Sequence, residues 1–337
     1  MELIQQLSQE LKLRPAQVEA AVRLLDEGNT IPFIARYRKE MTDSLDDAAL
    51  RDLSDRLEYL RNLQKRREEV IRSITEQGKL TPELETAIQA AATLAEVEDL
   101  YRPYRPKRRT RGSIAREKGL EPLAAAIRVQ NTLREPLSMA AEYVNPEKGV
   151  ETAEDALSGA MDIIAEDISD DGEIRKALRL LIHRAAVVTA TGDSTENTTY
   201  KMYYDFKEPV GRIAPHRVLA INRGEKEGFL KTAIVLEEEK ALEAIRRKTV
   251  IANNACGRAV MEAAADSWKR LIAPSMENET FRELFENASE QAIRVFAENL
   301  HHLLMQPPLT GQVVLGWDPG YRNGCKLAVV DATGRVL

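Results

Sequence analysis

Apolar residues recur at helical spacing through most of this chain, so the sequence predicts a mainly helical fold. The clearest case is residues 45–77, where leucine and isoleucine return every three or four residues without glycine or proline. We expect one long amphipathic helix there, or two, with Ser44 as the N-cap. A second long helix is predicted over residues 279–304, about 40 Å in length. Shorter helices are expected over residues 3–11, 15–25, 83–98, 120–129, 135–144, 152–166, 173–186 and 242–268.

Alternation of apolar and polar residues predicts a few strands among the helices. Residues 217–222 and 229–236 alternate on either side of the segment RGEKEG, so we expect a β-hairpin there. Residues 313–317 and 325–330 predict two further strands. The most polar stretch, residues 189–199, is predicted to be a linker or mobile loop.

Residues 101–111, which we call the basic loop, hold six basic residues, two tyrosines, two prolines and no acidic residue. Pro103 and Pro106 lack a backbone donor, so we expect a semi-extended surface loop. Clustered cations repel one another and need an acidic partner or an external polyanion. Tyrosine rings on such a loop could stack on bases. The candidate nucleic-acid contacts are Tyr101, Arg102, Tyr104, Arg105, Lys107, Arg108, Arg109 and Arg111.

A structural interpretation of the basic loop remains open. Its arginines could form salt bridges to the acidic helix that carries Glu96, Glu98 and Asp99, because charge runs are often only solvated faces. In that case the two tyrosines would be half buried and would anchor the loop.

A second, weaker candidate is the segment 31–40, in which two apolar residues precede a tyrosine and the cations Arg36, Arg38 and Lys39. These three cations are further candidate nucleic-acid contacts. The alternative is a loop in which Phe33 and Ile34 fill the core while the arginines pair with nearby acids. Those acids are Asp43, Asp46 and Asp47.

Composition limits the classes of partner. The chain has a net charge of −6, so a nucleic-acid contact must be a local basic patch on an acidic protein. Cys256 and Cys325 have no spaced partner, which indicates a reducing compartment and neither a disulfide scaffold nor a zinc site. The sequence shows neither a signal peptide nor the roughly 20 apolar residues that span a bilayer, so we expect a cytoplasmic protein without a membrane partner.

No sequence motif favours catalysis. The four histidines have no metal-ligand spacing, and the sequence contains no phosphate-cradling glycine loop and no nucleophile motif. We therefore expect a protein that is not an enzyme and that has no cofactor.

Four segments carry a family resemblance: residues 99–124 (DLYRPYRPKRRTRGSIAREKGLEPLA), 31–40 (IPFIARYRKE), 216–228 (HRVLAINRGEKEG) and 315–331 (LGWDPGYRNGCKLAVVD). In this order along the chain they resemble the Tex family of bacterial transcription accessory proteins, from about residue 15 to the last residue. The sequence departs from the family pattern at Arg105, Trp317 and Asn323, where lysine, a smaller aliphatic residue and threonine are expected. None of these departures removes a charge from the basic loop.

The resemblance implies a mainly α multi-helix scaffold, with the small β-hairpin as an insertion and the first strands of an incomplete RNase H-like α/β domain at its end. The expected divisions are 1–188, a helical N-terminal domain with the basic loop, 189–310, a central region, and 311–337, a truncated YqgF-type domain. In active nucleases of that fold, the acid that matches Asp318 helps to hold Mg²⁺. One carboxylate does not form that site, so we expect a vestigial position, no bound metal and a fragment of a longer protein.

The resemblance also implies binding to RNA or DNA and association with RNA polymerase or other transcription machinery. It implies that complete members carry helix-hairpin-helix and S1 domains further on. We expect a non-catalytic transcription accessory protein whose basic loop contacts nucleic acid, and a monomer is favoured. The alternative is a scaffold that binds RNA polymerase or other transcription factors and in which the basic loop is structural.

Overall fold

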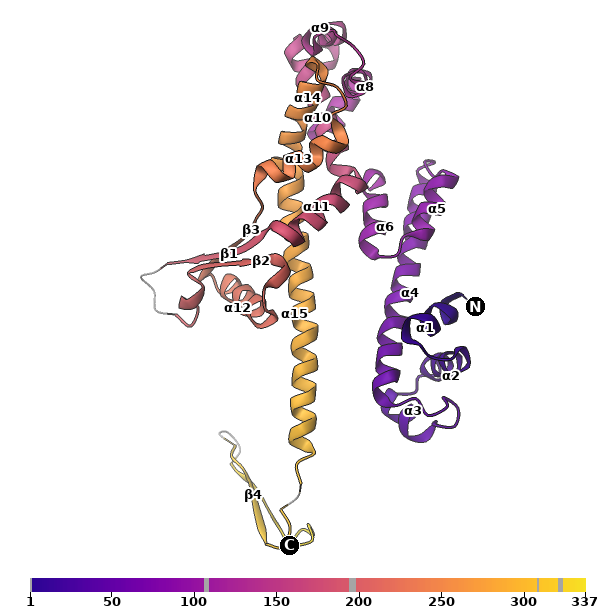
Figure 1. The fold of residues 1–337 in the computed structure, drawn as a ribbon, viewed down its shortest axis with the longest axis vertical. Coiled ribbons are helices and arrows are strands. Elements are labelled where there is room, and N and C mark those ends of the chain that lie inside the picture. The colour runs from indigo at the N-terminus through magenta and orange to yellow at the C-terminus, as the bar shows by residue number, and fades with distance from the viewer. Residues whose placement is uncertain (1, 106–108, 194–197, 308, 321–323) are drawn as a thin grey trace. The chain divides into compact units, whose positions relative to one another are not determined.

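The computed structural model describes residues 2–105, 109–193, 198–307, 309–320 and 324–337 (Figure 1). It confirms a mainly helical chain with small antiparallel sheets. The chain divides into two compact units. The first unit is Met1–Leu181 with Glu237–Pro274, and the second is Ile182–Leu236 with Ser275–Leu337.

The first part of the first unit is built on one long helix, α4, as its leucine spacing predicts (Figure 1). Three short helices pack on it and share a core in which Leu7, Leu24, Ile34, Leu50 and Leu53 are almost completely buried. These elements are α1 (Glu2–Leu11), α2 (Pro15–Asp26), α3 (Ile31–Tyr37) and α4 (Asp47–Glu76).

The predicted N-cap of α4 is wrong by two residues. Asp46 caps the helix, because its carboxylate accepts a hydrogen bond from the backbone N–H of Ala49 at 2.8 Å. Ser44 lies in the preceding turn with a φ of 59°. The serine hydroxyl therefore lies outside the helix start.

The rest of the first unit is arranged around α10 (Ala153–Asp170), which packs against α7, α8, α9 and α14. The predicted helix over 242–268 is two helices, separated by a short loop after Thr249. The other elements are α5 (Pro82–Ala90), α6 (Leu94–Tyr101), η1 (Arg102–Tyr104), α7 (Arg111–Glu117), α8 (Glu121–Val129), α9 (Pro136–Ala140), η2 (Ala141–Tyr143), η3 (Pro146–Lys148), α11 (Gly172–Ala185), α13 (Glu238–Thr249), α14 (Ala255–Asp266) and the π-helical η6 (Ser267–Ile272).

Gln130 joins α8 to the loop between α13 and α14. It ends α8 in the left-handed conformation, and only 3% of the residue is exposed. Its carboxamide donates to the carbonyl of Thr249 at 2.8 Å and accepts the N–H groups of Ile251 and Ala252, each at 3.0 Å. One side chain thereby satisfies three backbone groups that are distant in sequence.

The second unit contains a three-stranded antiparallel sheet in the order β2-β1-β3, from Asp205–Pro209 (β2), Val187–Gly192 (β1) and Leu230–Val235 (β3). The strand expected over 229–236 is confirmed, whereas the hairpin expected with residues 217–222 is wrong. Those residues lie inside α12 (Pro215–Lys226), because proline at the first helical position and the three-residue spacing of Val218 and Ile221 favour a helix. Short 3₁₀ turns cover Lys201–Tyr203 (η4) and Val210–Arg212 (η5).

The expected linker over residues 189–199 also differs from the structure. Its first residues complete β1, the central strand, which pairs with β2 and β3. Residues 194–197 lie outside the described residues.

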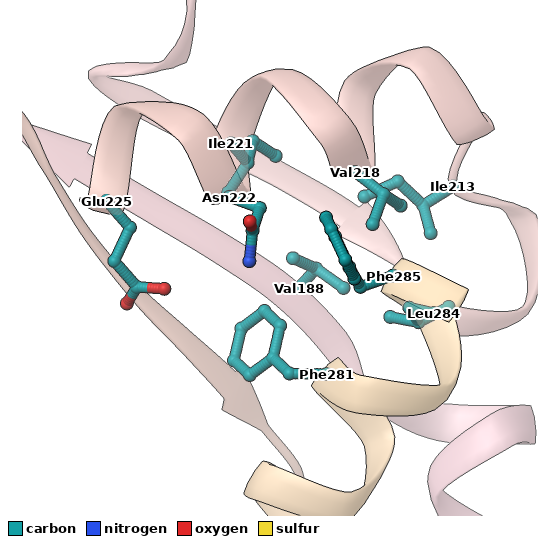
Figure 2. Close-up of a pocket in the computed structure, with 9 residues that line it drawn as sticks. All are labelled: Val188, Ile213, Val218, Ile221, Asn222, Glu225, Phe281, Leu284 and Phe285. Atoms are coloured by element: carbon teal, nitrogen blue, oxygen red, sulfur yellow. The ribbon is translucent and has the colours of Figure 1, made fainter. Parts of the chain in front are cut away.

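The long helix α15 (Ala273–Leu304) contributes to the core of the second unit through its first half. Figure 2 shows Phe281, Leu284 and Phe285 of this helix facing β1 and α12 across a narrow seam. The cavity there is about 10 Å³, which is room for about one water molecule. The seam is therefore part of the hydrophobic core and no small-molecule site.

Two strands, β4 (Val314–Asp318) and β5 (Lys326–Val330), form an antiparallel pair, as the sequence predicts. Among the described helices, none has the length and apolar character needed to cross a bilayer.

Replacement of Gln130 by leucine should lower the free energy of unfolding by about 1 to 3 kcal/mol, because the backbone N–H groups of Ile251 and Ala252 lose their acceptor. Urea denaturation of the variant measures the loss. Gln89→Leu, at an exposed position of α5, is the matched control and should change stability by no more than about 0.5 kcal/mol. Equal stabilities of the two variants would show that Gln130 does not hold this joint.

Candidate nucleic-acid interface

The basic loop begins later than the sequence predicts. Helix α6 continues through Tyr101, and Arg102–Tyr104 forms the 3₁₀ turn η1 before the chain enters α7 at Arg111. Pro103 is tolerated because it occupies the first turn of η1, where a missing N–H costs no hydrogen bond. Pro106 and the candidate contacts Lys107 and Arg108 lie outside the described residues.

The two tyrosines of the loop are anchored on α4. Tyr101 is 9% exposed, its hydroxyl is 2.9 Å from the hydroxyl of Ser73, and the guanidinium of Arg66 lies over its ring. Tyr104 packs against the apolar cluster that contains Tyr101 and residues of α4 such as Val70 and Ile74. Its carbonyl accepts a hydrogen bond from Gln77 at 2.8 Å. Tyr101 is therefore buried as an anchor of the loop, whereas Tyr104 is anchored but keeps part of its side chain at the surface.

The acidic side chains of α6 bind arginines of the scaffold. Asp99, 7% exposed, lies 2.8 Å from Arg179 and 3.5 Å from Arg175 on α11. Glu98 accepts a hydrogen bond from Arg66 at 2.6 Å, and this bond raises the pKa of Arg66 above its ordinary value. Arg175 and Arg179 were not among the residues singled out from the sequence, although their spacing of four residues places them on one helix face.

The arginines of the basic loop are more weakly paired. Arg105 lies 3.6 Å from Glu98 with 56% of its side chain exposed. Arg109 lies 3.5 Å from Glu117 with 73% exposed. Both separations exceed a good charge-assisted hydrogen bond. Arg111 is exposed at the start of α7, whereas Arg102 is partly buried. Arg105, Arg109 and Arg111 therefore offer their guanidinium groups to solvent.

Helix α7, which carries the end of the loop, is fixed on α10. Thr110 and Ser113 form a capping box at its start. Arg116 bonds to Glu166 at 3.0 Å and to Asp167 at 2.6 Å. A side chain at Gly112 would collide with Glu166, since a Cβ there would lie 2.6 Å from its carboxylate. The loop thus ends on a rigid support.

Arg111 also faces an acidic residue of α10. Burial raises the pKa of Asp162, and the nearby charges of Arg270 and Arg111 oppose that rise. Arg270 makes the direct contact, at 3.0 Å. Arg111 therefore stabilises the ionised form of Asp162 only from a distance.

The second candidate segment is a helix, α3, where a loop was the alternative. Ile34 is completely buried, as expected, while Phe33 is only partly buried. Arg38 donates to the carbonyl of Tyr37 at 3.1 Å, and its guanidinium lies 5.1 Å from the centre of the Phe33 ring.

The predicted acidic partners of this segment are engaged elsewhere. Asp43 binds Arg14, Asp46 caps α4, and Asp47 binds Arg51 at 2.7 Å. Within the described part of the chain, no ion pair joins these acids to the cations of α3. The structural alternative for Arg36, Arg38 and Lys39 therefore loses its proposed pairs.

Asp318 ends β4 opposite Lys326 of β5 and is exposed. Across the residues described, no group of three or more His, Cys, Asp or Glu side chains is placed to hold a metal ion.

Three family models match successive parts of the chain. Residues 1–75 match the Tex-like protein N-terminal domain, and residues 131–296 match the Tex central region-like family. Residues 312–337, which include β4 and β5, match the Tex protein YqgF-like domain. The chain belongs to the Tex family. The expected start of a YqgF-type domain is thereby confirmed.

Three relatives show the range of sequence identity to known proteins. The chain is 48% identical to the uncharacterised protein YdcI of Bacillus subtilis, over 99% of this chain and 47% of that protein. It is 40% identical to transcriptional accessory protein Tex of Neisseria gonorrhoeae, over 100% of this chain and 45% of that protein. It is 30% identical to S1 RNA-binding domain-containing protein 1 of Homo sapiens, over 100% of this chain and 35% of that protein. The chain spans about half or less of these curated relatives.

Substitution of Asp99 by asparagine should destabilise the first unit by about 3 to 5 kcal/mol, because it removes the negative charge from a buried ion pair that Arg175 and Arg179 share. The double variant Arg105→Gln, Arg109→Gln should lose no more than about 1 kcal/mol, since exposed ion pairs contribute little. Urea denaturation of both variants measures these losses. If the double variant is destabilised as strongly as Asp99→Asn, the loop arginines are structural.

Proposed function

We propose that this Tex chain is a non-catalytic, nucleic-acid-binding part of a transcription accessory protein, and that its basic loop contacts phosphate groups. The observation that carries the proposal is the contrast between two sets of arginines. Three scaffold arginines, Arg66, Arg116 and Arg179, have a carboxylate oxygen at 2.6 to 3.0 Å, although a fourth, the buried Arg175, lies 3.5 Å from Asp99. The exposed arginines of the loop lie 3.5 and 3.6 Å from theirs.

This contrast favours an external anion. Exchange of a long, solvent-exposed ion pair for a phosphate costs little, because such pairs contribute less than about 1 kcal/mol. A guanidinium binds phosphate through two parallel hydrogen bonds, which adds energy and orientation. On a chain with a net charge of −6, the cluster Arg105, Arg109 and Arg111 is a local basic surface.

The names of two relatives support this class of partner. The Neisseria gonorrhoeae relative is named a transcriptional accessory protein, and the human relative is named for an S1 RNA-binding domain. RNA is accordingly the polyanion with which we would test this chain first.

A second candidate function is a scaffold for protein partners, such as RNA polymerase or other transcription factors. The distal half of α15 favours it, because Ile293, Phe296 and Leu303 are each more than 60% exposed. Contiguous exposed apolar side chains often mark interaction surfaces. The two functions are compatible, since they use different residues.

Replacement of Arg105, Arg109 and Arg111 by glutamine should weaken binding to labelled RNA and lower its dependence on salt. Each neutralised phosphate contributes about 0.7 to the slope of log affinity against log salt on single strands, so the variant should show a shallower slope. Fluorescence anisotropy over a salt series measures both effects. A matched variant that replaces the exposed cations Arg23, Lys65 and Arg294 by glutamine controls for net charge.

If the wild-type chain does not bind RNA or DNA, or if the two triple variants bind alike, the basic loop is no phosphate site. Melting curves of all three proteins belong to the experiment. Unchanged melting with abolished binding supports the proposal, whereas a large drop in melting temperature supports a structural role.

A further inference from the structure

The end of α3 presents to solvent an aromatic residue that is more exposed than either tyrosine of the basic loop. Tyr37 is 61% exposed, in contrast to the 9% of Tyr101. Its ring lies 5.3 Å from that of Phe33, one helical turn earlier, and meets it at 47°. Phe33 is covered by the guanidinium of Arg38, so it forms a support beside Tyr37. Most of the Tyr37 ring remains available for contact.

Cations flank this ring on both sides in sequence. Arg36 and Lys39 are exposed, and no ion pair is seen for either among the residues that the structure describes. Arg38 is used locally, by the carbonyl of Tyr37 and by the Phe33 ring. Glu40 is the one acid in the segment 36–40. The local charge is therefore positive on a chain that is acidic as a whole.

The turn after α3 holds the backbone of this segment in place. The carbonyl of Arg38 accepts hydrogen bonds from the backbone N–H groups of Met41 and Thr42, at 3.0 and 3.2 Å. Thr42 is completely buried, and its hydroxyl bonds to the same carbonyl at 3.3 Å. Gln17 of α2 donates to the carbonyls of Thr42 and Asp43 at 3.4 and 3.2 Å. A backbone fixed in this way loses little freedom on binding.

We infer that the end of α3 is a stacking site for an unpaired base of single-stranded nucleic acid, with Tyr37 as the stacking residue and Arg36 and Lys39 as its phosphate contacts. The inference rests on the proposed function, because it gives the nucleic-acid-binding chain a second surface with an exposed aromatic ring, whereas Tyr101 of the basic loop is buried.

Single strands are favoured over duplexes for a geometric reason. The faces of paired bases are covered by their neighbours in the double helix, so an exposed tyrosine ring can stack only on a base that is splayed out. Stacking on aromatic rings tolerates any base sequence, since every base has a π-face. The site should therefore discriminate strand type more strongly than base sequence.

Tyr37→Ala should weaken binding of a labelled oligouridylate by about 5-fold to 100-fold, the range found when an aromatic stacking residue is removed. Tyr37→Phe should bind like the wild type, because the phenyl ring keeps the π-face. Binding of a labelled duplex should be the same for all three proteins. Fluorescence anisotropy measures these affinities, and unchanged melting curves exclude unfolding.

The same assay separates the two proposals. If the triple variant of the basic loop loses affinity while Tyr37→Ala does not, the stacking site is wrong and the proposed function stands. If the wild type binds no nucleic acid, both fail. If Tyr37→Ala lost as much affinity for the duplex as for the single strand, the stacking site would be wrong. It would also be wrong if polyglutamate displaced the RNA from the wild type and from Tyr37→Ala equally well, because the ring would then add nothing to charge attraction. Photocrosslinking with iodouridine-substituted RNA should map to Tyr37, and a map without it contradicts the site.

Discussion

The position of the basic loop depends on one buried carboxylate. Asp99 lies between Arg175 and Arg179 of α11, and the chain enters η1 only three residues after it. Charges removed from water are costly unless their geometry is good, so such a cluster defines one arrangement more than it adds stability. The direction in which the chain leaves α6 follows from this contact. Tyr101, at the end of α6, then attaches this turn to α4 through the contact of its hydroxyl with that of Ser73.

Acidic side chains are distributed unequally between scaffold and surface. Glu98, Glu166 and Asp167 accept short hydrogen bonds from arginines that join helices. The exposed loop arginines Arg105 and Arg109 make only longer contacts with carboxylates, at 3.6 and 3.5 Å. The same holds at α3, where Asp43, Asp46 and Asp47 each have another partner. A chain with excess negative charge thus presents two local basic surfaces.

The sequence was sufficient to predict α4, because its helical pattern is long. It was also sufficient to predict β4 and β5, because these paired strands are neighbours along the chain. It failed at residues 217–222, where a short apolar run fits a strand as well as a helix. The sheet partner of β3 is β1, about 40 residues earlier in the chain. Local alternation could not reveal that pairing.

The candidate site shows the same limit. Its basic residues were visible in the sequence, but the burial of Tyr101 depends on Ser73, which lies 28 residues away. The exposure of Tyr37 depends on how α3 packs on α4, which also lies beyond local pattern. Composition therefore identified where cations gather, and tertiary contacts decided which aromatic rings are accessible.

Glu98 serves both the scaffold and the loop. It is held by Arg66 at 2.6 Å and only approached by Arg105 at 3.6 Å. If Arg105 turned to a phosphate, Glu98 would keep its stronger partner, so no carboxylate would be left unpaired. Encounter would then require no prior rearrangement of the helices, and its rate would be set by diffusion and electrostatic attraction. Differences in affinity between ligands would lie chiefly in how long each complex lasts.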